Sequence, residues 1–297
     1  MPTQLQIAPT LAEFFGVRLS PKPQARPIEQ ILKYFRSHDH DPQVLGFVVI
    51  DSLDSQFYSE FADELKTIHG LAEQDERDER DERDERDELG GLLLECETVS
   101  SHTTPAIASI LTGLPPEAHG ILTSKDVGKS GVRSVLEVLE DAGKPTAVVI
   151  ETKGAEPLWN KISSVFAVDD REDILEYDDL ITKHTVSALK KHAERRGKEL
   201  SVVFSHLRAI DRFAHRGWDL SVAARAVDEN VREIANAVSE RAGGAGGGEA
   251  GGGEAGGGGA GGGGGLLLLC GDHEAHLKSR RSRSGSKEKA TVPLIVY

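Results

Sequence analysis

Six short apolar runs alternate along the chain with segments of helical periodicity, and this alternation constrains the fold more than any other feature. The runs cover residues 46–50, 92–95, 146–150, 200–205, 266–270 and 292–296. Most of them are continuously apolar, as expected for strands that are covered on both faces. Strands that alternate with helices favour a mostly parallel sheet with helices packed on both sides. The sequence therefore predicts an α/β fold with a central, mostly parallel sheet.

Three segments between the apolar runs have helical patterns. Residues 57–68 carry aromatic and aliphatic side chains three or four positions apart. A second pattern covers residues 132–142 and ends at Gly143, which is a suitable residue for the end of a helix. The third covers residues 219–242. We expect these three segments to be helices that cover the sheet.

The length of 297 residues is sufficient for one large core, so we expect residues 1–297 to form a single domain. Two low-complexity insertions interrupt it. Residues 75–88 repeat Asp-Glu-Arg, which places acidic residues four positions before arginines and predicts a solvated, charged helix. Residues 243–265 are nearly all glycine and alanine, a composition that predicts a mobile loop.

The composition limits the class of protein. A formal net charge of −14 argues against a general nucleic-acid binder, because phosphate backbones attract basic surfaces. The N-terminal residues lack the basic and apolar regions of a secretory signal, and no apolar run reaches membrane-spanning length. Cys96 and Cys270 lie in or beside apolar runs and are interpreted as buried thiols. We therefore expect a highly soluble cytoplasmic protein.

Polar residues follow several of the predicted strands. Asp51 comes directly after one run, Asp272 and His273 follow another after a single glycine, and Asp211 with His215 follows a third. In parallel sheets, ligands bind beyond the carboxyl ends of the strands. Carboxylates and neutral imidazoles hold zinc or manganese. Together these residues predict a metal site, although each aspartate alone could equally cap a helix or close a turn.

Thr103 supplies a hydroxyl near the same edge of the predicted sheet. It precedes a helix that we expect to begin at Pro105, a favourable first helical residue. Helix amides there would favour a phosphate beside the threonine, and a hydroxyl directed at a metal becomes a nucleophile. The alternative is that Thr103 only caps this helix. The combination indicates phosphoester chemistry.

Four motifs together resemble the alkaline phosphatase superfamily, in particular its phosphodiesterase and nucleotide pyrophosphatase branch. They are VVIDSLD around Asp51, HTTPAIASILTGLPPEAHGI from His102, IDRFAHRGWD around Asp211, and LLLLCGDHE before and around Asp272. The terminal PLIVY is similar to a strand that follows the last motif in the family. The resemblance implies an alkaline-phosphatase-like fold.

The resemblance also implies a two-metal mechanism. Asp211 and His215 would hold one divalent metal, and Asp51, Asp272 and His273 would hold the second together with the Thr103 oxygen. The metals would be zinc, with manganese as an alternative. Thr103 would attack phosphorus and form a phosphorylated intermediate that water then hydrolyses. The expected partner is a small phosphorylated substrate, a phosphodiester or a nucleotide pyrophosphate.

The chain departs from the family pattern at three places. Relatives complete the shell of the first metal with another histidine, for which His276 is the nearest substitute. Many phosphodiesterase relatives carry an asparagine that donates to a phosphoryl oxygen where this chain has Ser124. The segment 7–17 is similar to one that follows the last strand in relatives; alternatively it is an amphipathic helix on the sheet edge. Two further histidines are expected to be structural, with His119 ordering its loop and His206 hydrogen-bonded in the core.

Several alternative functions stay open. A phosphomonoesterase or phosphomutase would use the same metals and hydroxyl, and a catalytically degraded member would only bind a phosphorylated ligand. A sulfatase is disfavoured, because that branch needs a cysteine or serine followed by Pro and then Arg. The matching stretch here is Thr103-Thr104-Pro105-Ala106-Ile107. Oligomeric state is not indicated by any motif.

Overall fold

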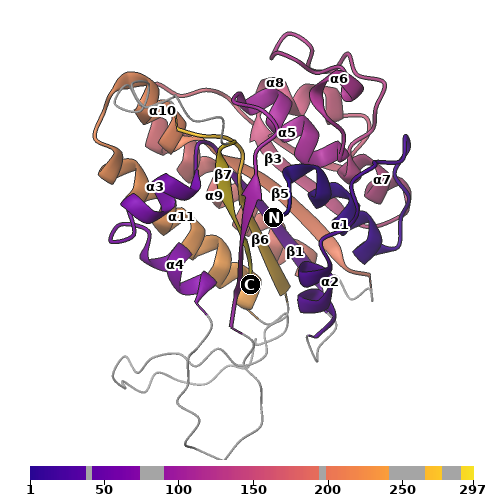
Figure 1. Cartoon of the computed structure of the whole chain (residues 1–297), viewed down its shortest axis with the longest axis horizontal. Helices are drawn as coiled ribbons and strands as arrows, with labels where there is room; N and C mark the ends of the chain where they lie inside the picture. The colour runs from indigo at the N-terminus through magenta and orange to yellow at the C-terminus, as the bar shows by residue number, and fades with distance from the viewer. Residues whose placement is uncertain (38–41, 74–89, 194–198, 241–264, 276–288) are drawn as a thin grey trace, which may run out of the picture.

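The protein is built on one seven-stranded sheet with strand order β2-β7-β6-β1-β5-β3-β4 (Figure 1). The computed structural model describes residues 1–37, 42–73, 90–193, 199–240, 265–275 and 289–297. The strands are β1 (Val44–Ile50), β2 (Leu92–Glu97), β3 (Thr146–Glu151), β4 (Ser164–Val168), β5 (Ser201–Leu207), β6 (Gly265–Gly271) and β7 (Thr291–Val296). All neighbouring pairs are parallel except those that β7 makes with β6 and β2. The predicted α/β class is therefore confirmed.

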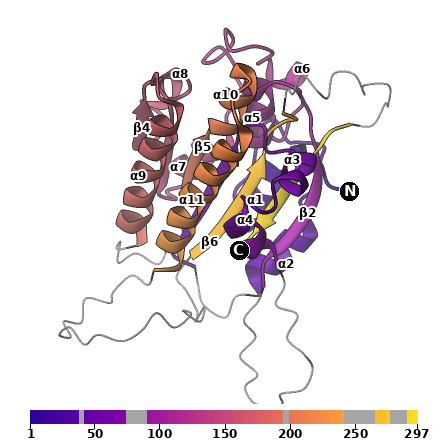
Figure 2. The same cartoon turned by 90° about the vertical axis from the view of Figure 1, so that its left-hand side faces the viewer.

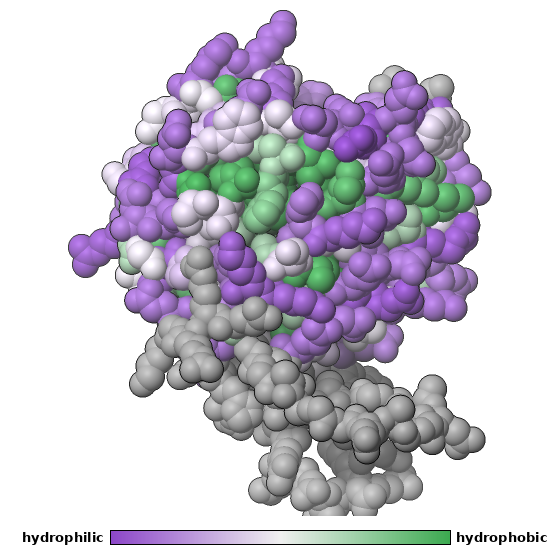
Figure 3. Space-filling model, turned by 180° about the vertical axis from the view of Figure 1, so that it is seen from behind, coloured by the Kyte–Doolittle hydropathy of each residue, from purple (hydrophilic) through white to green (hydrophobic). Residues whose placement is uncertain are grey.

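Each of the six apolar runs forms one of these strands. The seventh strand, β4, is not among the predicted runs. Its side chains are only partly buried, since it ends the sheet and pairs on one side with β3. Its apolar run, residues 165–168, is only four residues long. β4 is labelled in Figure 2, and Figure 3 shows the rear of the molecule, where apolar residues are gathered among hydrophilic ones.

Helices cover both faces of the sheet (Figure 2). One layer consists of α3 (Ser55–Glu60), α4 (Lys66–Ala72), α9 (Ile174–Ala193), α10 (Ala209–Arg216) and α11 (Leu220–Ser239). The other consists of α1 (Ile7–Phe15), α2 (Glu29–Arg36), α5 (Thr103–Thr112) and α7 (Val135–Asp141). The short elements η1 (Gln4–Gln6), α6 (Pro116–His119), α8 (Thr152–Ala155) and η2 (Glu156–Leu158) complete the chain as described. The central strand β1 is buried along its whole length, because both layers press on it.

The helical patterns are confirmed with changed boundaries. The 57–68 stripe forms two short helices, α3 and α4, instead of one continuous helix. α7 begins after Ser134, whose hydroxyl and Glu137 form a capping box, and Gly143 follows its end with a left-handed φ of 78°. α11 begins after Asp219, which caps it. The N-terminal segment forms α1 as an amphipathic helix, but it packs against α2, α5 and α7 within a layer and not on the sheet edge.

Other expectations have mixed outcomes. Cys96 and Cys270 are buried free thiols, as predicted. The expected charged helix at 75–88 lies outside the described residues, as does the expected glycine-rich loop at 243–265 except for Gly265, which begins β6. Among the helices that the structure describes, none has both the length and the apolar character needed to cross a bilayer.

Candidate active site

Two buried carboxylates lie side by side at the carboxyl ends of neighbouring strands. β1 and β6 are parallel, and Ile50 is paired in register with Gly271. The residue that follows each strand is an aspartate. Asp51 follows β1, and Asp272 follows β6. Their exposed fractions are 1% and 0%. The strand register alone thus brings together two residues that lie far apart in the sequence.

A glycine before Asp272 permits this close approach. A Cβ atom on Gly271 would lie 1.9 Å from the carbonyl oxygen of Leu53, which no real side chain could tolerate. The backbone after β1 therefore crosses directly against the end of β6. The glycine in the LLLLCGDHE motif is therefore required on steric grounds alone, whatever the chemistry of the site.

His273 and Thr103 complete a compact group around these carboxylates. The His273 Nε2 atom lies 3.1 Å from Asp51 Oδ1 and 3.6 Å from Asp272 Oδ2. The Thr103 hydroxyl lies 3.1 Å from the same nitrogen and 3.3 Å from Asp51 Oδ1. One ligand atom from each of Asp51, Asp272 and His273 lies within 4.8 Å of the other two, so these residues could hold a metal ion.

The position of Thr103 differs from the expectation in one respect. α5 begins at Thr103 and not at Pro105, with His102 as the N-cap residue. Proline is tolerated in the first helical turn because its missing N–H would have no partner there, so Pro105 fits inside the turn. Thr103 therefore does not cap the helix; its half-buried hydroxyl faces Asp51 and His273.

The predicted pair Asp211 and His215 lies one turn apart on α10. His215 Nε2 is 3.3 Å from Asp211 Oδ1, and 59% of the His215 side chain is exposed. The Ser52 hydroxyl donates to the same Asp211 oxygen at 3.0 Å, while the Ser52 amide donates to Asp272 Oδ1 at 2.8 Å. Ser52 thus joins the two parts of the site, and it adopts a left-handed φ of 65°, rare for a residue with a side chain. The sequence analysis missed this role, although Ser52 lies within the VVIDSLD motif.

The loop after β6 is also held by Asp54, the last residue of the VVIDSLD motif, and by Gln4, which belongs to no motif. Asp54 caps α3 through one carboxylate oxygen and accepts a hydrogen bond from the Ala275 amide at 2.8 Å with the other. The side chain of Gln4 donates to the carbonyl oxygens of Gly271 and Asp272. Only the tertiary structure reveals these contacts, because Gln4 lies more than 260 residues before its partners.

His206 and Glu151 extend the charged group toward β3. His206 is buried at the end of β5, with Nε2 3.7 Å from Asp51 Oδ2 and Nδ1 3.5 Å from Glu151 Oε2. Its burial confirms the expectation of a core histidine. Burial would lower the pKa of His206, but Glu151 and the other nearby carboxylates raise it above its usual value. The carboxylates around His206 thus favour its protonated form.

The three candidate ligands strongly shift the pKa values of one another. Burial first, and then the negative charge of Asp51, raise the pKa of Asp272 to about 7. Burial would also raise the pKa of Asp51, but the hydrogen bond with His273 and the charges of His206 and His273 lower it overall. Burial would lower the pKa of His273, yet Asp272 and Asp51 raise it to about 10. Such perturbed groups are frequent at functional sites.

The two remaining predicted site residues are Ser124 and His276. Ser124 is exposed in the loop after α6, and no hydrogen bond of the described residues joins it to Thr103. His276 lies outside the described residues, so its role as a ligand stays a prediction. The expectation for His119 is confirmed: it is buried, lies 3.1 Å from the Ser109 hydroxyl and accepts a hydrogen bond from the Ile121 amide.

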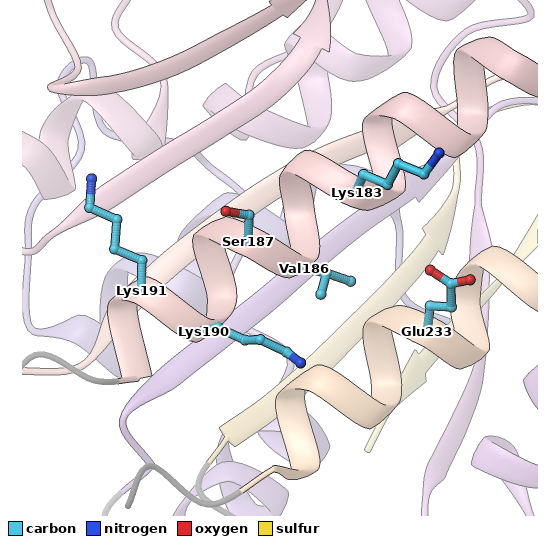
Figure 4. A pocket seen from close by; sticks show the side chains of 6 residues that line it. All are labelled: Lys183, Val186, Ser187, Lys190, Lys191 and Glu233. Atoms are coloured by element: carbon cyan, nitrogen blue, oxygen red, sulfur yellow. The ribbon is translucent and has the colours of Figure 1, made fainter.

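A separate open groove lies between α9 and α11 (Figure 4). Its lining residues are Lys183, Val186, Ser187, Lys190, Lys191 and Glu233. Five of them lie on α9 from its middle to its C-terminal end, which runs away from the strand ends that carry the candidate ligands, and Glu233 lies on α11. The Lys190 ammonium is paired with Glu240 at 2.8 Å. This groove therefore contributes nothing to the site.

Comparisons with known proteins identify relatives of the fold. No protein-family model matches the sequence, and no curated protein matches it. Among solved structures, a candidate sulfatase of Bacteroides thetaiotaomicron is similar with a TM-score of 0.55 and 11% identity, covering 86% of this chain and 64% of that one. Murine ectonucleotide pyrophosphatase/phosphodiesterase 5 is similar with a TM-score of 0.50 and 12% identity, covering 77% of this chain and 57% of that one.

A 2-O glycosaminoglycan sulfatase is a further neighbour, with a TM-score of 0.53 and 10% identity. It too is longer than this protein, which covers 64% of its length. The chain therefore spans about six tenths of the length of these neighbours. At such low identities the similarity concerns the fold. The chain has the alkaline-phosphatase-like fold, and its structural neighbours include members of the superfamily that its four motifs resemble.

Proposed function

We propose that the protein is a metal-dependent phosphoester hydrolase in which Thr103 is the nucleophile. The observation that carries this proposal is the position of the Thr103 hydroxyl. It lies within 3.3 Å of both Asp51 and His273, beside three buried residues able to bind one metal ion. The fold similarity to phosphodiesterase and sulfatase structures supports hydrolysis of an ester of this general kind.

The residues present fit a divalent cation. Asp272 Oδ2 is buried and has no hydrogen-bond partner among the described residues, which is costly for a carboxylate oxygen. The charge of Asp51 further disfavours an ionised Asp272. Two carboxylates and an imidazole are suitable ligands for zinc or manganese, and a cation there would offset both costs. We propose Asp51, Asp272, His273 and the Thr103 oxygen as the ligands of this ion.

A second ion is proposed at Asp211 and His215, with His276 as a third ligand. When bound, the two ions would stabilise the negative charge that develops on the attacking and leaving oxygens. Asp211 is 7% exposed and is already oriented by the Ser52 hydroxyl. Burial and the charge of Asp51 raise the pKa of Asp211, which is a further reason to expect a cation beside it.

The chain itself positions the phosphoryl group and the nucleophile. Thr103 is the first residue of a ten-residue helix, so free backbone amides and the helix dipole favour a phosphate beside its hydroxyl. The Thr103 oxygen forms the new bond to phosphorus while the bond to the leaving alcohol or phosphate breaks, and the hydroxyl proton is released to solvent. Water then hydrolyses the phosphorylated threonine and restores the enzyme.

A phosphodiester or a nucleotide pyrophosphate is the proposed substrate class, with a phosphomonoester as the alternative. The motif resemblance favours the diester, and Ser124 is proposed to donate to a phosphoryl oxygen in the place of an asparagine. A sulfate ester fits less well, because Thr103 cannot become the formylglycine that sulfatases use. Ile107 also stands where that branch has an arginine.

The test is a substrate panel with zinc- or manganese-loaded protein. The aryl phosphodiester should be hydrolysed fastest, the aryl phosphate more slowly and the aryl sulfate least. Acid quenching during turnover should trap a phosphoryl group on the peptide that contains Thr103, detected by mass spectrometry. Undiminished hydrolysis by a Thr103→Ala variant would show that the nucleophile is wrongly assigned.

A member that only binds a phosphorylated ligand is the second candidate. The exposure of His215 favours it, since a weakly held ion at this position would leave the reaction without its second cation. Metal analysis of purified protein separates the two candidates. Two equivalents of zinc or manganese would support the hydrolase, whereas one or none would support the binding protein. Transfer of labelled phosphate to an acceptor without phosphate release would instead identify a phosphomutase.

A further inference from the structure

The side chain of Gln4 is buried where three segments of the chain meet. Its exposed fraction is 0%, although it lies in the first turn of the described chain. Its amide nitrogen donates to the carbonyl oxygens of Gly271 at 3.0 Å and of Asp272 at 2.6 Å. Its amide oxygen accepts from the Val99 amide at 3.0 Å. Both donor hydrogens and one acceptor position are thus used.

These partners belong to the two loops that form the candidate site. The Gly271 and Asp272 carbonyls are at the point where β6 ends and the chain turns into Asp272 and His273. Val99 lies between the end of β2 and Thr103. One side chain therefore connects the backbone that carries two candidate ligands with the backbone that leads to the candidate nucleophile.

The N-terminal segment is itself anchored beside this junction. The Glu97 amide donates to the Pro2 carbonyl at 2.9 Å, and Thr3 forms a parallel bridge with Glu97. Gln4 is consequently held at a fixed place at the end of β2. The backbone of Gln4 is anchored and its side-chain amide makes three directional hydrogen bonds, so the side chain can act as a rigid spacer between the two loops.

We propose that Gln4 is a positioning residue that sets the separation between the loop of Asp272 and His273 and the loop that leads to Thr103. The inference rests on the proposed function, since it takes these residues as ligands and nucleophile. Loss of the bonds removes an amide donor from each of two buried backbone carbonyls, which is unfavourable. Groups that orient metal ligands typically contribute about 10–100-fold to metal affinity.

Two substitutions separate the roles of the amide. Gln4→Met keeps the approximate volume and removes all three hydrogen bonds. Gln4→Glu removes only the two donors and keeps an oxygen that can accept from Val99. Gln6→Glu is the matched control, because Gln6 lies in the same turn but bonds to Thr3 and Arg26, which belong to neither loop.

Two readouts test the proposal. Zinc affinity measured by calorimetry should fall by about tenfold or more in both Gln4 variants and by less than about twofold in the control. Hydrogen exchange of the metal-free proteins, followed by mass spectrometry, should accelerate in peptides that span 97–102 and 270–275. Exchange elsewhere should be unchanged, which distinguishes positioning from a general loss of stability.

The outcomes separate this proposal from the proposed function. Wild-type protein that binds no zinc would contradict the metal site, while exchange in the two loops would still decide the role of Gln4. Folded Gln4 variants with wild-type zinc affinity and wild-type loop exchange would overturn the positioning role. Variants that unfold completely, as judged by circular dichroism, would also count against it, because Gln4 would then support the whole fold.

Discussion

The two parts of the candidate site are built in different ways. Asp51, Asp272 and His273 are each at most 1% exposed and lie at the ends of adjacent strands. Asp211 and His215 lie on one turn of α10, and most of the His215 side chain is exposed. The first part is fixed by the register of a buried sheet. The second is fixed only by helical spacing and by the packing of one short helix.

Because of this difference, the strand-end group needs less rearrangement to bind a metal ion than the helical pair. Ser52 and Gln4 donate hydrogen bonds to the strand-end group and Asp54 accepts one from the Ala275 amide, so little ordering is needed when an ion enters. The helical pair offers a metal ion two described ligands, Asp211 and His215, and 59% of the His215 side chain is exposed. We therefore expect two unequal metal sites, with Ser52 as the physical link between them because it bonds to both Asp272 and Asp211.

The largest expected effect is that of Thr103→Ala, which removes the proposed nucleophile. Turnover of an aryl phosphodiester should fall by at least about a thousandfold, because no other hydroxyl replaces the attacking group. Thr103→Ser keeps the hydroxyl and should retain much of the activity. Zinc affinity should change by less than about tenfold in either variant, since the three other donors stay in place. Equal activity of the alanine and serine variants would contradict the assignment.

Asparagine substitutions at Asp272 and Asp211 compare the two parts directly. Asp272→Asn should weaken the tighter zinc site by more than about a hundredfold, since even groups beside a ligand contribute roughly 10–100-fold. Asp211→Asn should weaken only the looser site. Titration with zinc followed by calorimetry measures both affinities in each variant. Identical losses in the two variants would mean that the two parts form one site.

Asp178 connects the helical part to the core and supplies a pH test. It is buried on α9 and accepts hydrogen bonds from the Arg208 and Ala209 amides at the start of α10. Burial raises the pKa of Asp178 to about 6, so the folded state binds its proton more tightly than the unfolded state. Its contribution to stability is therefore greatest below pH 4 and declines as pH rises toward 6.

The difference in unfolding free energy between wild type and Asp178→Asn isolates this contribution. It should shift against the wild type by about 2 kcal/mol between pH 4 and pH 7. Urea unfolding at several pH values measures it. A difference that is independent of pH would show that the Asp178 carboxyl has an ordinary pKa.

The smallest expected effect is that of Ser52→Ala. This change removes the hydrogen bond to Asp211 and keeps the amide that donates to Asp272. The looser zinc site should weaken by about tenfold, or ~1.4 kcal/mol, and the tighter site should not change. The matched control is Ser55→Ala, which alters a hydroxyl bonded to Thr291 away from the ligands. Weakening of the tighter site alone would reverse the assignment of the two parts.

Much of the fold could be predicted because its strands are buried on both faces. β1, β3, β5 and β6 are nearly continuous apolar runs, and the residues that follow three of them are the candidate ligands. β4 was not among the predicted strands, because its apolar run of residues 165–168 is short and most of its side chains are only partly buried at the edge of the sheet. The 57–68 stripe likewise gave the correct buried face but not the break between α3 and α4.

Apolar runs and helical periodicity indicated the α/β class, six of the seven strands and the kinds of donor at the strand ends. Only the tertiary structure decided which strand ends are neighbours, and hence that Asp51 meets Asp272 while Gln4 and Ser52 hold the loops around them. The physical reason is that burial leaves a periodic pattern in the sequence. Register between strands and single hydrogen bonds across more than 200 residues leave none.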